Sequence, residues 1–582
     1  MMRFKGKVAH KFAESPLLEL RLPAWRSRLM ALMILASFVV LIGRAFYLQI
    51  IDTDFLQEKG ESRYRRDIEI SASRGRIADR HGDVLAISTP MRSIWAVPPA
   101  VQLTPEQTQQ LAALLETDAQ TLSRKLATDK PFVFLRRQIP PPVAAQVAAL
   151  KLPGIGQDKE YRRFYPTGEM TAHMVGFTGV DDKGLEGAEL AFHGQLLGTP
   201  GSRSVIKDRR GQIVEDVGSI KPPQDGDDIS LALDSKVQYL AYSQLKQAIA
   251  DRKAKAGGVV VLDARTGEIL ALANWPTYNP NNRASLSGGQ LRNRALTDTF
   301  EPGSTLKPFT IALAMETGKV RFDTLINCAP GRLRVGGATI SDTHRYGLLS
   351  VAEVIQKSSN VGSAKIAAML PAQVMWEMFD GVGFGQVPSL GFPGEVSGRL
   401  RPWKSWRPIE QATMSFGHGI SVSLIQLARA YSVFARDGDL VPLSLTRIGS
   451  SRPRGAQVFS PQTAREVRAM LEMAVRPGGT APKAQIPGYR VAGKTGTARK
   501  LENGRYTTKN YVASFVGFAP ASDPRLIVAV MIDEPRGKYY GGEVAAPVFA
   551  AVMAGTLRTL GIAPDAPLEV AQSGKPAAKA RL

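Results

Sequence analysis

A long uncharged segment near the N-terminus is the feature that most constrains how this chain can fold. Residues 29–43 carry no charge, and after Arg44 the apolar run continues to residue 51. A helix needs roughly 20 apolar residues to cross a bilayer, so residues 29–51 are predicted to form a transmembrane anchor. Arg44 would extend toward the headgroups near its outer end.

The residues before this segment predict its orientation. Positions 1–28 carry seven Lys or Arg against two acidic residues, and the positive-inside rule then places the N-terminus in the cytoplasm and everything after residue 51 outside. A cleaved signal peptide is the alternative, because Gly43-Arg44-Ala45 loosely fits a cleavage site of small residues. The apolar run continues past that site through Leu48, which favours a retained anchor, although cleavage stays open.

Length and composition exclude several classes of function. With 582 residues, the chain is long enough for two or three domains. Its single cysteine, Cys328, excludes an internal disulfide, and the six histidines show no metal-ligand spacing, so neither a metal nor a cofactor is expected. The net charge of +22 is spread along the chain without a nucleic-acid-binding motif. We therefore expect a solvated cationic surface and no nucleic-acid partner.

The pattern of the remaining chain changes at about residue 229. Residues 52–225 are polar and mixed, whereas residues 257–274 read as two β-rich runs joined by a turn. Three strand-like segments follow between residues 489 and 533, and an apolar helix is expected over residues 545–562. Strands at both ends with helices between them predict one mixed α/β domain, of the α+β type, over residues 226–565. Its sheet should be antiparallel, with the first and last elements meeting. Residues 566–582 are predicted to be a disordered tail.

Three Ser-x-x-Lys tetrads occur, and context separates them. Ser304 follows a Pro-Gly pair immediately before a helical segment, and Lys307 should lie one turn further along that helix. A serine at a helix N-terminus faces unpaired N–H groups that suit an oxyanion, and a neutral lysine could take its proton. Ser204 and Ser243 begin the other two tetrads. Neither follows a chain break at the start of a helix, and both are interpreted as exposed polar residues.

Two further motifs lie in the same predicted domain. Ser358-Ser359-Asn360 follows a helical stretch and can present a hydroxyl and a carboxamide together. Residues 494–497, Lys-Thr-Gly-Thr, lie on a predicted strand, where Lys494 and Gly496 should share one face. Gly496 would remove side-chain bulk where a substrate backbone approaches. Either motif, taken alone, would usually occur by chance.

Together, in the order S-x-x-K, S-x-N and K-T-G, the three motifs are typical of penicillin-binding proteins and class A β-lactamases. The chain resembles the penicilloyl-serine transferases. The resemblance implies that Ser304 is the nucleophile, Lys307 its base and Ser358 a proton relay, with Asn360 binding the substrate amide. It further implies that Lys494 polarises the site and lowers the pKa of Lys307. Thr495 and Thr497, beside Gly496, would bind the terminal carboxylate, and the backbone N–H groups of Ser304 and Thr497 would form the oxyanion hole.

The resemblance extends over residues 30–562. Residues 74–86, 161–166 and 173–189 are similar to the pedestal motifs of class B penicillin-binding proteins, and residues 415–423 and 533–549 to the division-specific branch, the FtsI type. Residues 52–225 would then be a non-catalytic pedestal of the dimerisation type. The implied activity is that of a D,D-transpeptidase, which cross-links septal stem peptides, releases terminal D-Ala and is inhibited by β-lactams. The implied partners are a SEDS-type glycan polymerase and other divisome membrane proteins at the inner membrane.

Four alternatives compete with this interpretation. A β-lactamase would need a water-activating base and normally neither anchor nor pedestal, and a bifunctional polymerase would need a glycosyltransferase motif that residues 52–225 do not show. An elongation-specific class B transpeptidase differs from a division enzyme by its depletion phenotype, round cells against filaments. A catalytically inert divisome structural protein is disfavoured because all three motifs are complete.

Overall fold

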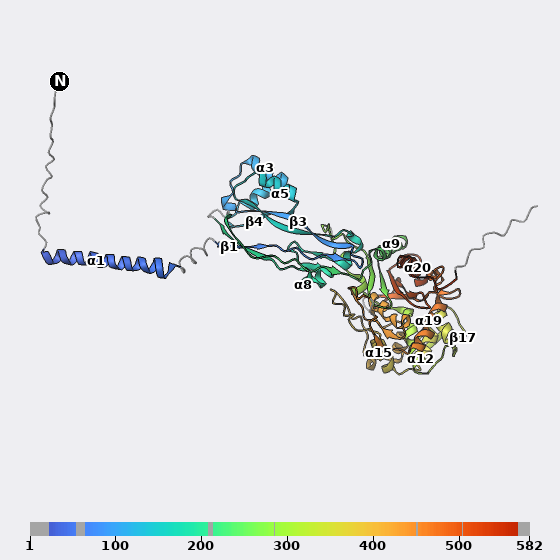
Figure 1. Ribbon diagram of the computed structural model, residues 1–582. Coiled ribbons are helices and arrows are strands. Elements are labelled where there is room, and N and C mark those ends of the chain that lie inside the picture. The colour runs from blue at the N-terminus through green and yellow to red at the C-terminus, as the bar shows by residue number, and fades with distance from the viewer. Residues whose placement is uncertain are drawn as a thin grey trace, which may run out of the picture.

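The computed structural model describes residues 23–53, 65–207, 213–284, 286–449, 452–502 and 505–567. Along the chain lie an N-terminal helix, an elongated β-rich region and a larger α/β domain (Figure 1). The predicted disordered tail lies almost wholly outside the described residues, as do positions 1–22 of the basic segment.

The N-terminal helix is longer than the predicted anchor. Helix α1 spans Ala24–Phe46, and a π-helical turn continues it over Tyr47–Ile51. This continuous helix of 28 residues has a mean hydropathy of 2.3 in its most apolar window and is long and apolar enough to cross a membrane. None of the residues of α1 is buried against the rest of the described chain.

The region after the helix is built on one long strand. Strand β3, Val84–Ala96, pairs antiparallel with β5, Ile155–Phe164, along ten residues. A small helical subdomain with its own apolar core packs at one end, and its first helix begins with a capping box of Thr104 and Gln107. The other strands are β1 Arg65–Ile70, β2 Ile77–Ala78, β4 Val133–Ile139, β6 Phe177–Thr178, β7 Gly184–Glu186, β8 Gly201–Lys207, β9 Ile213–Lys221 and β10 Ile229–Ser230. The helices are α3 Pro105–Leu114, α4 Ala119–Leu126, α5 Pro141–Ala149, α6 Ala172–Val175, α7 Gly187–Ala191 and α8 His193–Leu196.

A buried ionic cluster joins three distant segments of this pedestal. The guanidinium Nε atoms of Arg74 and Arg163 each donate to one oxygen of Glu189, both at 2.6 Å. All three side chains are at most 1% exposed. The three segments are those whose motifs the sequence resemblance singled out. Because removing one member of a buried ion pair costs about 3–5 kcal/mol, Glu189 is expected to be essential for the arrangement of these segments.

The C-terminal domain is organised by one five-stranded antiparallel sheet with the strand order β12-β11-β23-β22-β21. Its strands are β11 Ala256–Asp263, β12 Ile269–Trp275, β21 Ala492–Glu502, β22 Arg505–Ala519 and β23 Leu526–Asp533. Because β11 lies beside β23, the first and last parts of the domain meet as predicted. The sheet is buried on both faces, which explains its nearly continuous apolar strands.

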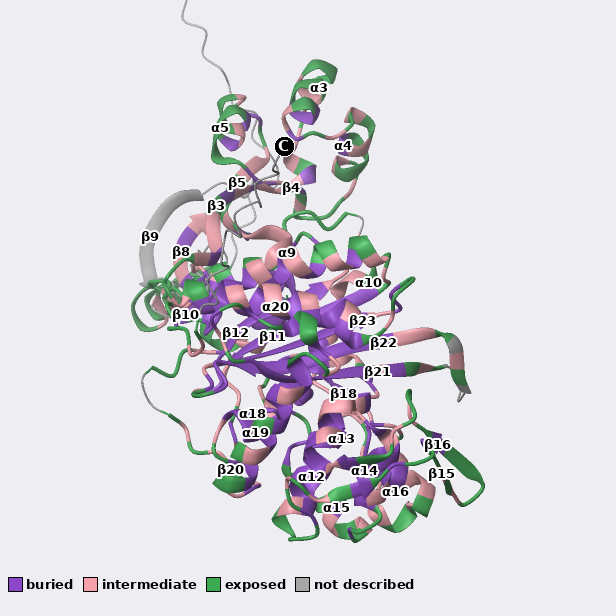
Figure 2. Ribbon diagram, turned by 90° about the vertical axis from the view of Figure 1, so that its right-hand side faces the viewer, coloured by how far each residue is buried: buried purple, intermediate pink, exposed green. Residues whose placement is uncertain are grey.

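Two layers of helices cover this sheet (Figure 2). Helices α9 and α20 pack on one face, and the other face meets a larger group of helices that includes α12, α13 and α19. The helices are α9 Ser235–Arg252, α10 Gly288–Leu291, α11 Arg294–Thr297, α12 Lys307–Glu316, α13 Val351–Lys357, α14 Asn360–Ala367, α15 Ala372–Gly381, α16 Pro408–Met414, α17 Leu424–Ala430, α18 Ser432–Ala435, α19 Pro461–Val475 and α20 Gly541–Thr559.

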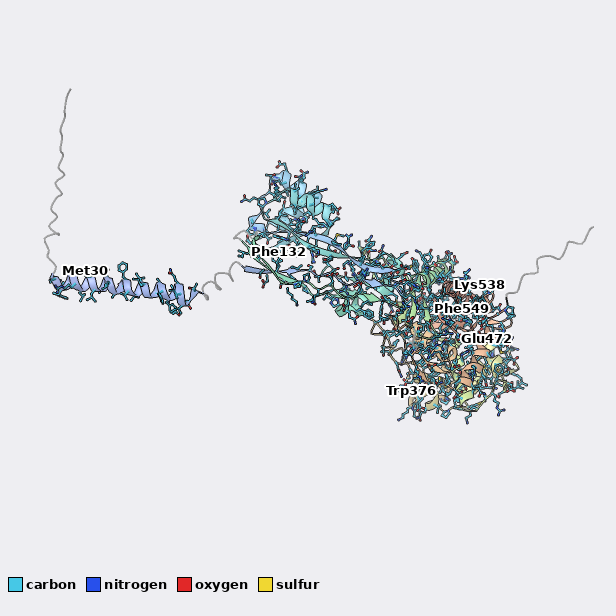
Figure 3. The ribbon with its side chains drawn as sticks, in the orientation of Figure 1. Met30, Phe132, Trp376, Glu472, Lys538 and Phe549 are labelled. Carbon is cyan, nitrogen blue, oxygen red and sulfur yellow. The ribbon has the colours of Figure 1, made fainter. Side chains whose placement is uncertain are left out.

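Short strand pairs complete the domain. They are β13 Thr299–Phe300 with β18 Val422–Ser423, β14 Leu325–Asn327 with β17 Leu348–Ser350, β15 Arg332–Val335 with β16 Ala338–Ser341, and β19 Asp439–Leu440 with β20 Ala456–Gln457. Figure 3 shows Phe549 of α20 within this dense domain, and Phe132 at the pedestal end remote from it. The predicted fold class, an anchor helix, a pedestal and a mixed domain with an antiparallel sheet, is confirmed.

Candidate active site

Ser304 lies in a tight turn that leads into helix α12. A 3-10 turn spans Gly303–Leu306, and the α-helix begins only at Lys307, whose backbone N–H donates to the carbonyl of Ser304. The expected helix start is therefore displaced by one short turn, which is a frequent way for a helix to begin. Ser304 is partly exposed, whereas Lys307 is fully buried.

The buried amine of Lys307 joins the first motif to the second. Its Nζ donates to the carbonyl of Ser358 at 2.5 Å, to Asn360 Oδ1 at 2.8 Å and to Ser358 Oγ at 3.0 Å. Within the described residues the hydroxyl of Ser304 makes no hydrogen bond. Ser304 and Lys307 are thus neighbours on one turn, and the amine is held by the Ser-x-Asn motif.

A sharp reversal of the chain presents the second motif. Ser358 ends helix α13 in the left-handed conformation, with φ 59° and ψ 41°. Ser359 then caps helix α14, its side chain accepting from the N–H of Gly362. A positive φ at a residue other than glycine is strained and is often found at functional sites. The reversal brings the Ser358 hydroxyl and the Asn360 carboxamide to the same amine.

Asp342 fixes this reversal, although sequence reasoning missed it. Its Oδ1 accepts from the backbone N–H groups of Asn360 at 2.5 Å and Val361 at 3.0 Å, and its Oδ2 accepts from Ser359 Oγ at 2.7 Å. A carboxylate at the N-terminus of α14 is also favoured by the helix dipole. Asp342 follows β16 and lies well before the Ser358–Asn360 motif in the sequence. No local sequence pattern therefore indicates the contact.

The third motif completes the group from the edge strand β21. Lys494 is fully buried, and its Nζ donates to Ser358 Oγ at 3.0 Å. The Ser358 hydroxyl therefore lies between two lysine amines, those of Lys307 and Lys494. All three sequence motifs meet at this oxygen.

Burial controls the protonation of both lysines. Desolvation lowers the pKa of Lys494 to about 7. The pKa of Lys307 is held well below its usual value, mainly by desolvation and secondly by the positive charge of Lys494, while Asp342 opposes the shift. A buried amine loses the hydration that stabilises its charged form. The predicted effect of Lys494 on Lys307 is present but secondary to burial.

The two threonines of the third motif are held by different neighbours. Thr495 Oγ1 donates to Thr480 Oγ1 at 3.1 Å, and Thr497 Oγ1 accepts from the backbone N–H of Gly541 at 3.0 Å. Thr497 is the more exposed of the two, and its hydroxyl hydrogen is not used in that contact.

Gly496 has a different role from the one expected. A Cβ at this position would lie 2.6 Å from the carbonyl oxygen of Pro302 and 2.3 Å from Ser514 Oγ. The missing side chain therefore lets β21 pack directly on the turn that carries Ser304, and the space is not open to a substrate. A Cβ on Gly303 would in turn approach the backbone N of Thr497 to 3.4 Å.

Two further groups beside the turn that carries Ser304 were not predicted as site residues. The Oε1 atom of Glu301 accepts from the N–H of Gly419 at 2.8 Å and from the hydroxyl of Tyr506 at 2.9 Å. Burial, with the nearby charges of Lys307 and Arg499, lowers the pKa of His418 to about 4, so its imidazole is neutral at neutral pH. Among the described residues no group of three or more His, Cys, Asp or Glu could hold a metal ion.

Comparisons with known proteins agree with this geometry. The penicillin binding protein transpeptidase domain matches residues 257–554, and the penicillin-binding protein dimerisation domain matches residues 69–231. The chain belongs to the penicillin-binding protein transpeptidase family. The resemblance inferred from the motifs is thereby confirmed, and the α/β domain is a penicillin-binding transpeptidase domain.

Relatives match nearly the whole chain. It is 47% identical over 549 residues to the probable peptidoglycan D,D-transpeptidase PenA of Neisseria gonorrhoeae, covering 93% of this chain and 94% of that one. It is 43% identical over 552 residues to the peptidoglycan D,D-transpeptidase FtsI of Escherichia coli K12, covering 93% of each. The solved apo structure of the TP domain of Burkholderia pseudomallei penicillin-binding protein 3 is 50% identical, with a TM-score of 0.54, and covers 58% of this chain and 98% of that one.

The two buried lysines generate a testable prediction. Replacing Lys494 by Gln should raise the pKa of Lys307, because a nearby positive charge that disfavours a second one is removed. NMR of protein carrying lysine labelled with ¹³C at Cε would follow this titration. Lys500→Gln is the matched control, since Lys500 pairs with Asp533 and Glu534 and should leave Lys307 unchanged. An unaltered Lys307 titration in Lys494→Gln would show that burial alone sets the pKa.

Proposed function

We propose that this protein is a peptidoglycan D,D-transpeptidase that works through an acyl-enzyme on Ser304. The observation that carries the proposal is the convergence of both lysine amines on Ser358 Oγ, with Ser304 one turn before Lys307. The PenA and FtsI relatives are named as peptidoglycan D,D-transpeptidases, the former as probable. The substrates are stem peptides ending in D-Ala-D-Ala, and β-lactams acylate the same serine.

The first half-reaction forms the acyl-enzyme. Ser304 Oγ attacks the carbonyl carbon of the penultimate D-Ala while neutral Lys307 accepts the hydroxyl proton, as its depressed pKa allows. The backbone N–H groups of Ser304 and Thr497 stabilise the oxyanion. The C–N bond then breaks, and the terminal D-Ala leaves after its nitrogen receives a proton through Ser358, which Lys307 and Lys494 both contact.

The edge strand and its threonines orient the donor peptide. Strand β21 lies at the edge of the sheet, so an extended peptide can add to its unpaired backbone groups. Thr495 and Thr497 bind the terminal carboxylate, with the spare hydroxyl hydrogen of Thr497 directed to it. Asn360 binds the substrate amide. For this, its Nδ2 gives up its hydrogen bond to the carbonyl of Ser341 and donates to the substrate instead.

The second half-reaction transfers the acyl group. A side-chain amine of a neighbouring stem peptide attacks the Ser304 ester, gives up a proton to the site base, and the ester C–O bond breaks to restore the serine hydroxyl. The product is a peptide cross-link. Hydrolysis of the same ester by water would instead give carboxypeptidase activity.

Covalent labelling with a fluorescent penicillin tests the nucleophile. Ser304→Ala should abolish labelling while leaving the fold intact, because the hydroxyl makes no hydrogen bond within the described residues. Ser243→Ala is the matched control and should label normally, since that serine begins another Ser-x-x-Lys tetrad but donates only to a carbonyl of its own helix. Continued labelling of Ser304→Ala, with thermal unfolding unchanged, would refute the assignment.

We also propose that the protein is held in the inner membrane at the division septum, with its N-terminus in the cytoplasm. The support is the exposed apolar helix Ala24–Ile51, the basic residues before it and the identity to an FtsI protein. Alkaline phosphatase fused after Gly60 should be active, and alkaline phosphatase fused before Arg28 should be inactive. The reason is that alkaline phosphatase folds only outside the cytoplasm. The opposite pattern of activities would contradict this topology.

The last proposal is that the protein cross-links glycan strands made by a separate SEDS-type polymerase. Helix α1 has no packing partner within the described chain, which leaves its faces for lipid or another membrane protein. Reconstituted with lipid-linked precursor alone, the purified protein should make no glycan. Adding the polymerase should yield cross-linked product that a β-lactam suppresses. Glycan synthesis by the isolated protein would overturn the assignment of residues 52–225 as non-catalytic.

A further inference from the structure

The hairpin of strands β15 and β16 has two different faces. Its register pairs Arg332 with Ser341 and Arg334 with Thr339, so these four side chains share one face, and all four are exposed. The other face is apolar and packs on a small core beside α14 and α16. In Figure 2 the hairpin extends from the helical layer and is mostly exposed. It is therefore held by its apolar side and presents its polar side to solvent.

The polar side of the hairpin is positively charged. Arg332, Arg334 and Arg345 are exposed, and within the described residues none of their guanidinium groups makes a hydrogen bond or an ion pair. Arg345 lies against the start of the hairpin, because a Cβ on Gly331 would lie 3.2 Å from its Cα. Asp342, three residues before Arg345, uses both carboxylate oxygens on the loop of the second motif. The part of the chain that the structure describes thus leaves these three charges uncompensated.

The base of the hairpin contacts the proposed active site. Asn360 Nδ2 donates to the carbonyl of Ser341 at 3.0 Å, and Ser341 lies opposite Arg332 in the hairpin. Neighbouring strands are about 4.8 Å apart, so Arg332 is one strand away from a group that binds the second motif. Arg334 lies two residues further out on the same face. The positive face therefore begins at the side of the site formed by Ser358 and Asn360.

The proposed chemistry brings the acceptor to this side of the site. The terminal D-Ala leaves after its nitrogen receives a proton through Ser358, and the acceptor amine enters the position that this nitrogen vacates, because aminolysis is the reverse of the step that expels an amine. The donor, by contrast, is bound along β21 by Thr495 and Thr497. The acceptor stem peptide then approaches beside the second motif, where the hairpin lies.

We propose that the positive face of the β15–β16 hairpin, with Arg345, binds the free carboxylates of the acceptor stem peptide and so helps bring its amine to the acyl-enzyme. Guanidinium groups pair with carboxylates in a forked geometry, and a cluster of like charges attracts an anionic chain from a distance. Each exposed pair changes affinity only several-fold. The hairpin is therefore expected to affect acceptor binding and not the formation of the acyl-enzyme. This inference rests on the proposed transpeptidase function.

Partition of the acyl-enzyme between water and an added amine tests the proposal. The purified full chain in detergent receives a D-Ala thioester donor and one of two acceptors: acetyl-Glu-Lys, which carries two carboxylates, or acetyl-Gln-Lys amide, which carries none. The wild type should show the lower acceptor KM with acetyl-Glu-Lys, and added salt should reduce this advantage. Arg332→Gln/Arg334→Gln should raise the KM for acetyl-Glu-Lys about three- to tenfold, without weakening the use of the amide. Labelling of this variant by fluorescent penicillin should stay normal.

A matched double variant controls for the loss of two positive charges. Arg465→Gln/Arg558→Gln removes exposed arginines from α19 and α20 and should keep the wild-type KM. Equal KM values of the two acceptors for the wild type, or an unchanged KM in a hairpin variant with normal thermal unfolding, would overturn the proposal. Weaker binding of that variant to anionic lipid vesicles, with its acceptor kinetics unchanged, would assign the face to a membrane and overturn it as well. A wild type that penicillin does not label would instead refute the proposed function itself.

Discussion

Two lysine amines buried around one serine hydroxyl are the constraint on which the arrangement of the catalytic domain depends. Burying a charged amine is expensive unless it is hydrogen-bonded or loses its proton. Here Lys307 and Lys494 both donate to Ser358 Oγ, and the pKa of each is lowered. Helix α12, the α13–α14 reversal and strand β21 must therefore all be correctly placed for the domain to be stable. The same arrangement places the amine of Lys307, whose pKa is lowered, one turn from Ser304, so stability and the proposed chemistry share their contacts.

Close backbone approach is the second requirement at this site. Strand β21 lies directly on the nucleophile turn because Gly496 has no side chain to separate it from Pro302. On the other side of the turn, Gly417 packs closely against Gly303. A Cβ on Gly417 would lie 2.1 Å from the carbonyl oxygen of Gly303. The turn that carries Ser304 is thus held between the edge of the sheet and the loop that carries His418, although the Ser304 hydroxyl makes no hydrogen bond with any described residue.

The pedestal is also held together by buried charged side chains. Glu189 pairs with both Arg74 and Arg163, and this buried cluster ties together segments separated by up to 115 residues. At the junction with the transpeptidase domain, hydrogen bonds join His173 to Gln290 and Asn293, and Tyr278 to Ala172.

The sequence by itself determined the elements whose signals are local. The anchor is identified by its continuous apolar run, the strands of the sheet by their β-rich segments, and the three short motifs by their spacing. Tertiary structure alone decided which groups meet across long separations. The binding of Asp342 to the Ser358–Asn360 reversal and the packing of Gly496 against Pro302 have no local signature. Their positions follow from how the sheet, helices and pedestal pack, and a linear pattern does not encode that packing residue by residue.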